Sequence, residues 1–215
     1  MGTPRVERLQ LPGPAGQIQA VIETPGNAVA RAFGVICHPH PLYGGTLDNK
    51  VIYTLSRAFH ELGVPTIRFN FRGVGASEGQ YADGIGETED ALAMVSYGRE
   101  RWGGTETWLA GFSFGGAVAI RAAASARPAR LVAVAPAVSR VDLTGVAPPE
   151  GPWLIVQGDA DELVSAAEVQ QWAAKQPHPP QLALLRGGEH FFHGRLNELR
   201  EAVTAFLRQH EAPGH

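Results

Sequence analysis

One serine in this 215-residue chain lies in a pattern that suits a nucleophile. Ser113 is the centre of Gly111-Phe112-Ser113-Phe114-Gly115, which follows an apolar run and precedes an alanine-rich segment. A strand that turns sharply into a helix here would lift the hydroxyl clear of a sheet, and the helix N-terminus would stabilise negative charge beside it. A tight turn with an N-capping serine would use the same residue types, so partners elsewhere in the chain have to decide between the two.

The first partner that a nucleophilic serine needs is a base that takes its proton. His190 is the best of the eight histidines for this role, because it follows the last apolar run in Gly187-Gly188-Glu189-His190-Phe191-Phe192. A flexible glycine-rich segment would let it reach the edge of a sheet. His193 is the close alternative, three residues further on.

The second partner is an acid that orients the base, and we expect it after the preceding apolar run. That run ends in Gly158-Asp159-Ala160-Asp161. We choose Asp161 as the acid, with Asp159 as the alternative; Asp159 lies nearer the turn glycine and is expected to brace the loop. Asp142 follows an earlier run and is the weaker candidate.

Short apolar runs that alternate with segments of helical period set the expected fold. Residues 6–11 and 18–23 alternate in polarity on either side of a Pro- and Gly-rich turn, which predicts an antiparallel hairpin. Nearly continuous apolar runs then predict buried strands at residues 32–37, 66–71, 107–111, 130–135, 153–157 and 182–185. Helices are predicted at residues 49–61, 86–101, 114–126, 165–176 and 196–208, and Ser165 with Glu168 has the pattern of a capping box.

This order predicts an α/β fold in a single domain over residues 1–215. We expect a doubly wound, mostly parallel sheet of about eight strands with an N-terminal antiparallel hairpin and helices on both faces. Ligands bind such sheets at the carboxyl ends of the strands. Ser113, Asp161 and His190 each follow a different predicted strand, so all three are expected at that edge.

With these residues in view, the chain resembles the α/β-hydrolase superfamily over nearly its whole length. It is most similar to small lidless bacterial serine hydrolases near the dienelactone-hydrolase-like and acyl-peptidase-like branches. The segments that carry the resemblance are 111–115, 158–161 with Val164, 188–192, Cys37-His38-Pro39-His40-Pro41, and residues 69–79. The resemblance implies a catalytic triad of Ser113, Asp161 and His190. Dienelactone hydrolases proper have cysteine where Ser113 stands, so their substrate is not carried over.

The resemblance also implies an oxyanion hole made of two backbone N–H groups. One belongs to Phe114, the residue after the nucleophile. The other comes from the loop at residues 38–45, where His40 is the first choice. Proline has no N–H to give, which leaves Leu42 and Tyr43 as the alternatives.

The expected reaction is hydrolysis of small acyl esters through an acyl-enzyme intermediate. Residues 135–152 are too short a connection for a helical lid, which predicts an open, shallow site suited to small substrates. Tyr43, Leu42 and Phe191 are expected to line an apolar pocket, and Phe112, Phe114 and Phe192 could also line it or pack in the core. The alternatives are a thioesterase, lactonase or short-peptide hydrolase, a lyase or transferase with the same triad, and a binding protein without catalysis.

Composition and motifs argue against several other functions. The net charge of −3 and the lack of a basic stripe make nucleic acid an unexpected partner, and no apolar stretch is long enough to cross a membrane. Residues 1–8 show no secretory signal, so a cytoplasmic location is expected. His38 and His40 lack a third metal ligand at a suitable spacing, so no metal is expected. Residues 73–78 depart from a dinucleotide loop at Glu78, so no cofactor is expected. The sequence does not indicate an oligomeric state.

Overall fold

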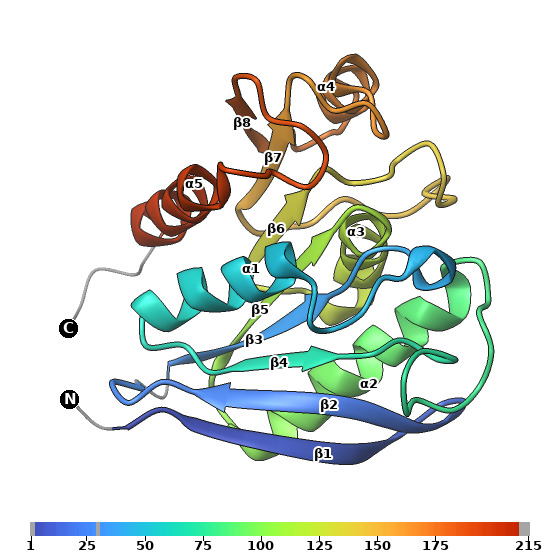
Figure 1. Ribbon diagram of the computed structural model, residues 1–215, viewed down its shortest axis with the longest axis vertical. Coiled ribbons are helices and arrows are strands. Elements are labelled where there is room, and N and C mark those ends of the chain that lie inside the picture. The colour runs from blue at the N-terminus through green and yellow to red at the C-terminus, as the bar shows by residue number, and fades with distance from the viewer. Residues whose placement is uncertain (1–2, 29–30, 211–215) are drawn as a thin grey trace.

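In residues 3–28 and 31–210, which the computed structural model describes, eight strands form one sheet in the order β1-β2-β4-β3-β5-β6-β7-β8 (Figure 1). The strands are β1 (Arg5–Gly13), β2 (Gly16–Thr24), β3 (Ala32–Cys37), β4 (Thr66–Phe69), β5 (Glu106–Phe112), β6 (Arg130–Val134), β7 (Trp153–Gly158) and β8 (Gln181–Leu185). Residues 1–2, 29–30 and 211–215 of the predicted single domain lie outside the described residues.

The sheet is mixed, as the sequence predicts. β1 and β2 form the antiparallel hairpin, and β2 also pairs antiparallel with β4. Every other pairing, from β4 through β3, β5, β6 and β7 to β8, is parallel. The carboxyl ends of the parallel strands therefore meet at one edge, and the segments that follow β3, β5, β7 and β8 share that edge.

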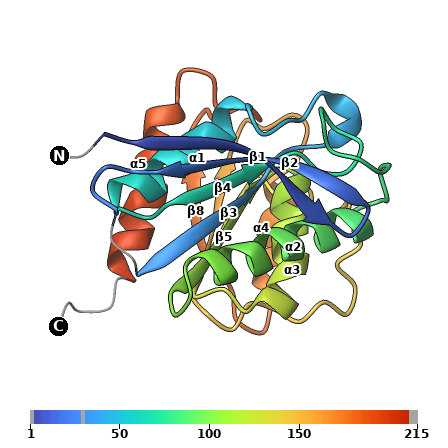
Figure 2. The same ribbon diagram turned by 90° about the horizontal axis from the view of Figure 1, so that it is seen from below.

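Helices cover both faces of the sheet. They are α1 (Lys50–Glu61), α2 (Ile85–Arg101), α3 (Phe114–Ala126), α4 (Ala166–Ala174) and α5 (Leu196–Gln209). Figure 2 shows α1 and α5 on one face and α2 and α3 on the other. The buried residues of α4 belong to the same apolar cluster as those of α2 and α3. The predicted doubly wound arrangement is confirmed.

The core consists of two apolar clusters separated by the sheet. Along β5, Leu109 belongs to the cluster under α2 and α3, while Trp108 and Ala110 belong to the cluster under α1 and α5. Side chains of a strand point alternately to its two faces, so a strand covered on both faces must be apolar throughout. All residues of β3, β6 and β7 are buried for this reason.

Local capping explains where two helices begin. The Asn49 side chain accepts N–H groups of Val51 and Ile52, so α1 begins one residue later than predicted. Ser165 accepts the N–H of Glu168 and so provides half of the predicted capping box. The Glu168 carboxylate accepts a bond from the Ser139 hydroxyl instead of the reciprocal one.

Residues 135–152, between β6 and β7, contain no helix or strand, so the expected absence of a cap domain on this connection is confirmed. Of the helices in the described part of the chain, none is both long enough and apolar enough to pass through a bilayer.

Candidate active site

Ser113 occupies a strained turn between β5 and α3. Its backbone has φ 54° and ψ −117°, a left-handed φ that residues other than glycine rarely adopt. A Cβ on Gly115 would come within 2.3 Å of the carbonyl oxygens of Cys37 and His38, so only glycine fits beside the end of β3. Ser113 is the N-cap residue of α3, but its side chain makes no capping bond to the helix, so capping does not explain the hydroxyl.

The predicted partners of Ser113 lie in one hydrogen-bonded chain. His190 Nε2 is 3.1 Å from Ser113 Oγ, and His190 Nδ1 is 2.8 Å from Asp161 Oδ2. Since the carboxylate only accepts, Nδ1 of a neutral His190 carries the proton and Nε2 is free to accept the serine proton. The three residues come from the ends of β5, β7 and β8, as the topology requires.

The Asp161 carboxylate is fully enclosed and saturated with donors. Oδ1 accepts the N–H groups of Leu163 and Val164 at 2.9 and 2.8 Å, and Oδ2 accepts Gln157 Nε2 at 3.0 Å in addition to His190. Burial acts to raise the pKa of Asp161, but the bonds from His190, Val164 and Leu163 and the attraction of His190 outweigh it. The pKa lies below its ordinary value, so the carboxylate stays ionised at neutral pH.

The alternative acids and bases lie elsewhere. His193 is exposed, and its Nδ1 pairs with Glu189 at 2.5 Å. Asp159 accepts the N–H of Gly187 at 2.5 Å, which braces the loop after β8 as expected. Asp142 is exposed and accepts the N–H of Thr144. Within the described residues, none of these side chains is hydrogen-bonded to the side chain of Ser113, His190 or Asp161.

The hydrogen bonds of the backbone show which N–H groups remain free to form an oxyanion hole. Phe114 is the first residue of α3, and the first N–H groups of a helix have no acceptor within it. In the loop after β3, the N–H of Leu42 is bonded to His40 Nδ1 and that of Tyr43 to the carbonyl of His40. Both alternatives are therefore occupied, which favours the N–H of His40.

His38 fixes the start of this loop. Its Nδ1 is 2.6 Å from the carbonyl of Pro39 and its Nε2 is 3.0 Å from the backbone N of Phe71. Nδ1 therefore donates and Nε2 accepts, which requires the neutral ring. Burial lowers the pKa of His38 to about 4.

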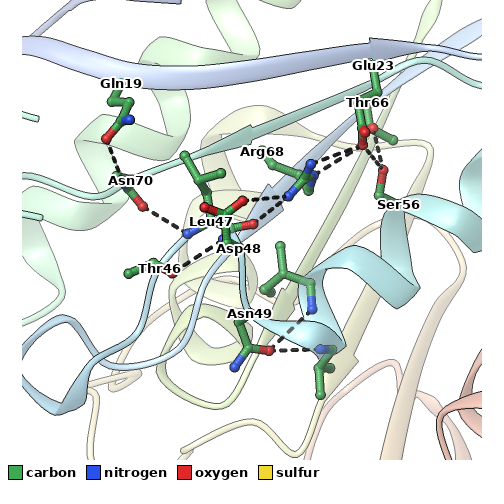
Figure 3. Close-up of polar contacts among 12 residues, drawn as sticks. Gln19, Glu23, Thr46, Leu47, Asp48, Asn49, Ser56, Thr66, Arg68 and Asn70 are labelled. Carbon is green, nitrogen blue, oxygen red and sulfur yellow. Dashed lines mark hydrogen bonds and ion pairs between the residues drawn. The ribbon is translucent and has the colours of Figure 1, made fainter. Parts of the chain in front are cut away.

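The end of the loop is fixed by β4 and the residue after it (Figure 3). Leu47 donates its N–H to Asn70 Oδ1 at 2.8 Å, and its carbonyl accepts Arg68 Nη1 at 2.7 Å. Arg68 is held in turn by Glu23 of β2 at 3.2 Å, and Asn70 by Gln19 at 2.7 Å. The loop expected to provide the second N–H is thus held at both ends by β4 and the residues that follow it.

Because the pKa of His38 is low in the folded protein, His38 is expected to make the protein less stable in acid. Its folded pKa of about 4 lies below the ordinary 6.5, so the unfolded chain binds the proton first as the pH falls. The stabilisation is complete above pH 6.5 and is lost towards pH 4, by about 2 kcal/mol between pH 7 and pH 5. Chemical denaturation of wild type and His38→Gln at both pH values measures this difference, which the variant should lack. The exposed-histidine control His193→Gln should keep it; equal pH dependence in His38→Gln and wild type would contradict this role.

A cavity of about 150 Å³ opens beside Ser113. It is lined by Pro39, His40, Tyr43, Gly44, Gly45, Asn49, Ser113, Phe114, Ala137, Arg140, Leu163, Val164, His190 and Phe191. A cavity of this volume holds a group of about the size of benzene. The lining is largely apolar with a few polar groups, which is typical of a small-molecule site.

The expected pocket residues divide into three groups. Tyr43, Phe191 and Phe114 line the cavity. Leu42 does not, and this expectation is wrong: residues 41–43 form a short 3₁₀ turn in which Leu42 is 65% exposed and lies outside the cavity lining. Phe112 and Phe192 are fully buried in the core instead.

The motifs set aside at the sequence level have structural explanations. Ser77 donates to the carbonyl of Asn70 at 2.6 Å and Arg72 pairs with Asp90 at 2.8 Å, so both hold the glycine-rich loop in place. Burial raises the pKa of the Cys37 thiol, as expected for a packing residue. Residues 3–28 and 31–210 contain no cluster of three potential metal ligands.

Sequence reasoning missed two polar residues at the site. Gln157 is fully buried and donates to Asp161. The sequence pattern that could have revealed it is a single amide side chain at the end of an otherwise apolar strand. Arg140 lines the cavity from the connection between β6 and β7. No pattern in the sequence distinguishes it from the chain's other arginines.

Comparison with known proteins supports the same fold. The model of the Alpha/beta hydrolase family matches residues 35–214. The uncharacterized protein RP471 of Rickettsia prowazekii is 32% identical over 209 residues, 91% of this chain and 86% of that protein. XC6422 of Xanthomonas campestris, described as an α/β serine hydrolase without lid, superposes with a TM-score of 0.93 at 38% identity, covering 98% of this chain and 97% of its own. An α/β serine hydrolase homologue from Coxiella burnetii has a TM-score of 0.89 at 43% identity, covering 96% and 98%.

Proposed function

The chain belongs to the alpha/beta hydrolase family, and from this premise we propose that it is a serine hydrolase that cleaves small acyl esters. The observation that carries the proposal is the chain of hydrogen bonds from Ser113 Oγ through His190 to Asp161, at 3.1 and 2.8 Å. Two relatives described as α/β serine hydrolases support the same class of enzyme.

In the proposed first half-reaction, Ser113 Oγ attacks the acyl carbonyl carbon while its proton passes to His190 Nε2. Asp161 stabilises the resulting imidazolium through the bond to Nδ1. The N–H groups of Phe114 and His40 bind the oxyanion of the tetrahedral intermediate. The intermediate then expels the alcohol, which takes its proton from Nε2, and the acyl group remains on Ser113.

In the second half-reaction a water molecule attacks the acyl-enzyme and gives a proton to His190. Collapse of the second tetrahedral intermediate releases the carboxylic acid and returns the proton to Ser113. The loop clamped by His38 and Arg68 holds one oxyanion donor in place through both steps. A preorganised donor needs no rearrangement as charge develops, which is the main source of its effect.

The size of the cavity favours short acyl groups. A volume of about 150 Å³ accepts a chain of a few carbons or one ring, and no lid extends the apolar surface for a long chain. We expect kcat/KM for 4-nitrophenyl esters to peak between two and six acyl carbons and to fall towards ten. A matching series of thioesters, which the same residues could cleave, measures the preference for oxygen esters. A rate that climbs steadily to ten carbons would contradict the small-acyl assignment.

A further inference from the structure

One charged side chain lines the cavity without a role in the proposed reaction. Arg140 is the only lysine or arginine among the described residues that line it, and they include no carboxylate. Arg140 is exposed, and its Nη2 donates to the carbonyl of Leu163 at 3.1 Å. Within the described part of the chain it forms no ion pair, although Asp159, Glu162 and Glu168 line a neighbouring cavity together with it.

The backbone holds Arg140 in a fixed relation to the nucleophile. The N–H of Ala137 donates to the carbonyl of Ser113 at 3.1 Å, and the N–H of Arg140 donates to the carbonyl of Ala137 at 3.0 Å. At the other end, Leu163 accepts the guanidinium and gives its own N–H to Asp161. The guanidinium therefore bridges the segment behind Ser113 and the loop that carries the acid.

Two of the carboxylates that line the neighbouring cavity with Arg140 are engaged by other donors: Asp159 accepts the N–H of Gly187, and Asp161 is bonded to His190. Asp161 is enclosed and accepts from four donors, as described above. The field of Arg140 reaches across the cavity: burial lowers the pKa of His40, and Arg140 lowers it further against the opposite effects of Glu87 and Asp83. A guanidinium has five N–H donors, and only one is used here, so the others are available to a ligand.

We propose that Arg140 binds a carboxylate of the substrate, so that the enzyme acts on short esters carrying one negative charge. The proposal rests on the proposed function and names its substrate class. Guanidinium and carboxylate form charge-assisted, often bidentate hydrogen bonds. A carboxylate fits better than a phosphate dianion, because the cavity supplies a single cation.

Paired substrates of nearly equal size, one anionic and one neutral, test this assignment. One pair places the charge on the leaving group: 4-acetoxybenzoate and the uncharged 4-acetoxybenzamide. The other pair places the charge on the acyl group: the mono-4-nitrophenyl ester of adipic acid, and the same ester with the free carboxylate replaced by an uncharged primary amide. The readout is the ratio of kcat/KM for the anion to that for the neutral partner. Each variant is judged by its own ratio, so a general loss of activity cancels.

For wild type we expect a ratio of about ten or more in at least one pair, decreasing as salt is added. Arg140→Gln should bring that ratio to about one, and Arg140→Lys should keep part of it. Arg121→Gln is the matched control: Arg121 binds the carbonyl of Asp142 on the same connection but does not line the cavity, so the wild-type ratio should persist.

Three results would overturn the proposal. The first is a ratio near one for wild type in both pairs. The second is a ratio that Arg140→Gln leaves unchanged. In both of these the neutral esters are still cleaved, so the proposed function stands while its substrate class is wrong. Failure to cleave any of the four compounds would reject the proposed function and, with it, the anionic substrate.

Discussion

Replacement of Ser113 by alanine is expected to lower kcat for ester hydrolysis by about 10⁵-fold and to leave the fold intact. The hydroxyl supplies the atom that forms the acyl-enzyme, so its removal leaves only the oxyanion donors and binding to accelerate attack by water. The side chain contributes little to stability, since its hydroxyl bonds to His190 and makes no capping bond. Alanine bears the same Cβ at the same positive φ, so the backbone strain is unchanged.

Steady-state kinetics on a short 4-nitrophenyl ester measures this effect, with circular dichroism to check the fold. Ser139→Ala is the control, because Ser139 is an exposed hydroxyl on the connection after β6 that does not line the cavity. Its activity should stay within about threefold of wild type. A Ser113→Ala variant that keeps a tenth or more of wild-type turnover would remove Ser113 from the proposed role.

Replacement of Asp161 by asparagine should lower kcat by about 10⁴-fold, because every group around this carboxylate is a donor. If the new amide turns its NH₂ towards His190, Nδ1 must accept and the proton moves to Nε2, which can then no longer take the serine proton. If the NH₂ turns the other way, it meets the N–H groups of Leu163 and Val164 and disrupts the loop. The first orientation disables the base and the second disturbs the loop that positions it, and neither supplies the negative charge that stabilises the imidazolium.

Asp159→Asn is the matched control for this second variant. In the described part of the chain the Asp159 side chain accepts the N–H of Gly187, and an amide oxygen can accept that bond equally well. Its turnover should remain within about tenfold of wild type. If the two variants lost activity to the same extent, the loop and not the carboxylate of Asp161 would be the important feature. Near-normal kcat in Asp161→Asn would exclude Asp161 as the acid.

The sheet, and the meeting of Ser113, Asp161 and His190 at its edge, could be predicted because each strand is marked by a short apolar run in the sequence. Strands covered on both faces are apolar over most of their length, so β3, β5, β6 and β7 are visible as runs in the sequence. Parallel strands bring their carboxyl ends to one edge, which is why residues as distant as Ser113 and His190 could be expected together.

The remaining features depend on contacts between distant segments, and no short pattern encodes them. The bond between His38 and the N–H of Phe71 joins residues 33 positions apart, and it fixes how the loop after β3 leaves the sheet. In that path, with its 3₁₀ turn, Leu42 is exposed and does not line the cavity, contrary to expectation. Arg140 gains its position from a backbone bond to Ser113 through Ala137, which the sequence does not reveal.

Covalent labelling with a fluorophosphonate tests the central claim most directly, because the reagent reacts with a serine that an adjacent base activates. Ser113 Oγ should displace fluoride from phosphorus, and peptide mass spectrometry should find one adduct per chain, on Ser113. Ser113→Ala should take up no label, and Asp161→Asn should react far more slowly. Unlabelled wild-type protein, or an adduct on another residue that persists in Ser113→Ala, would contradict the proposed nucleophile.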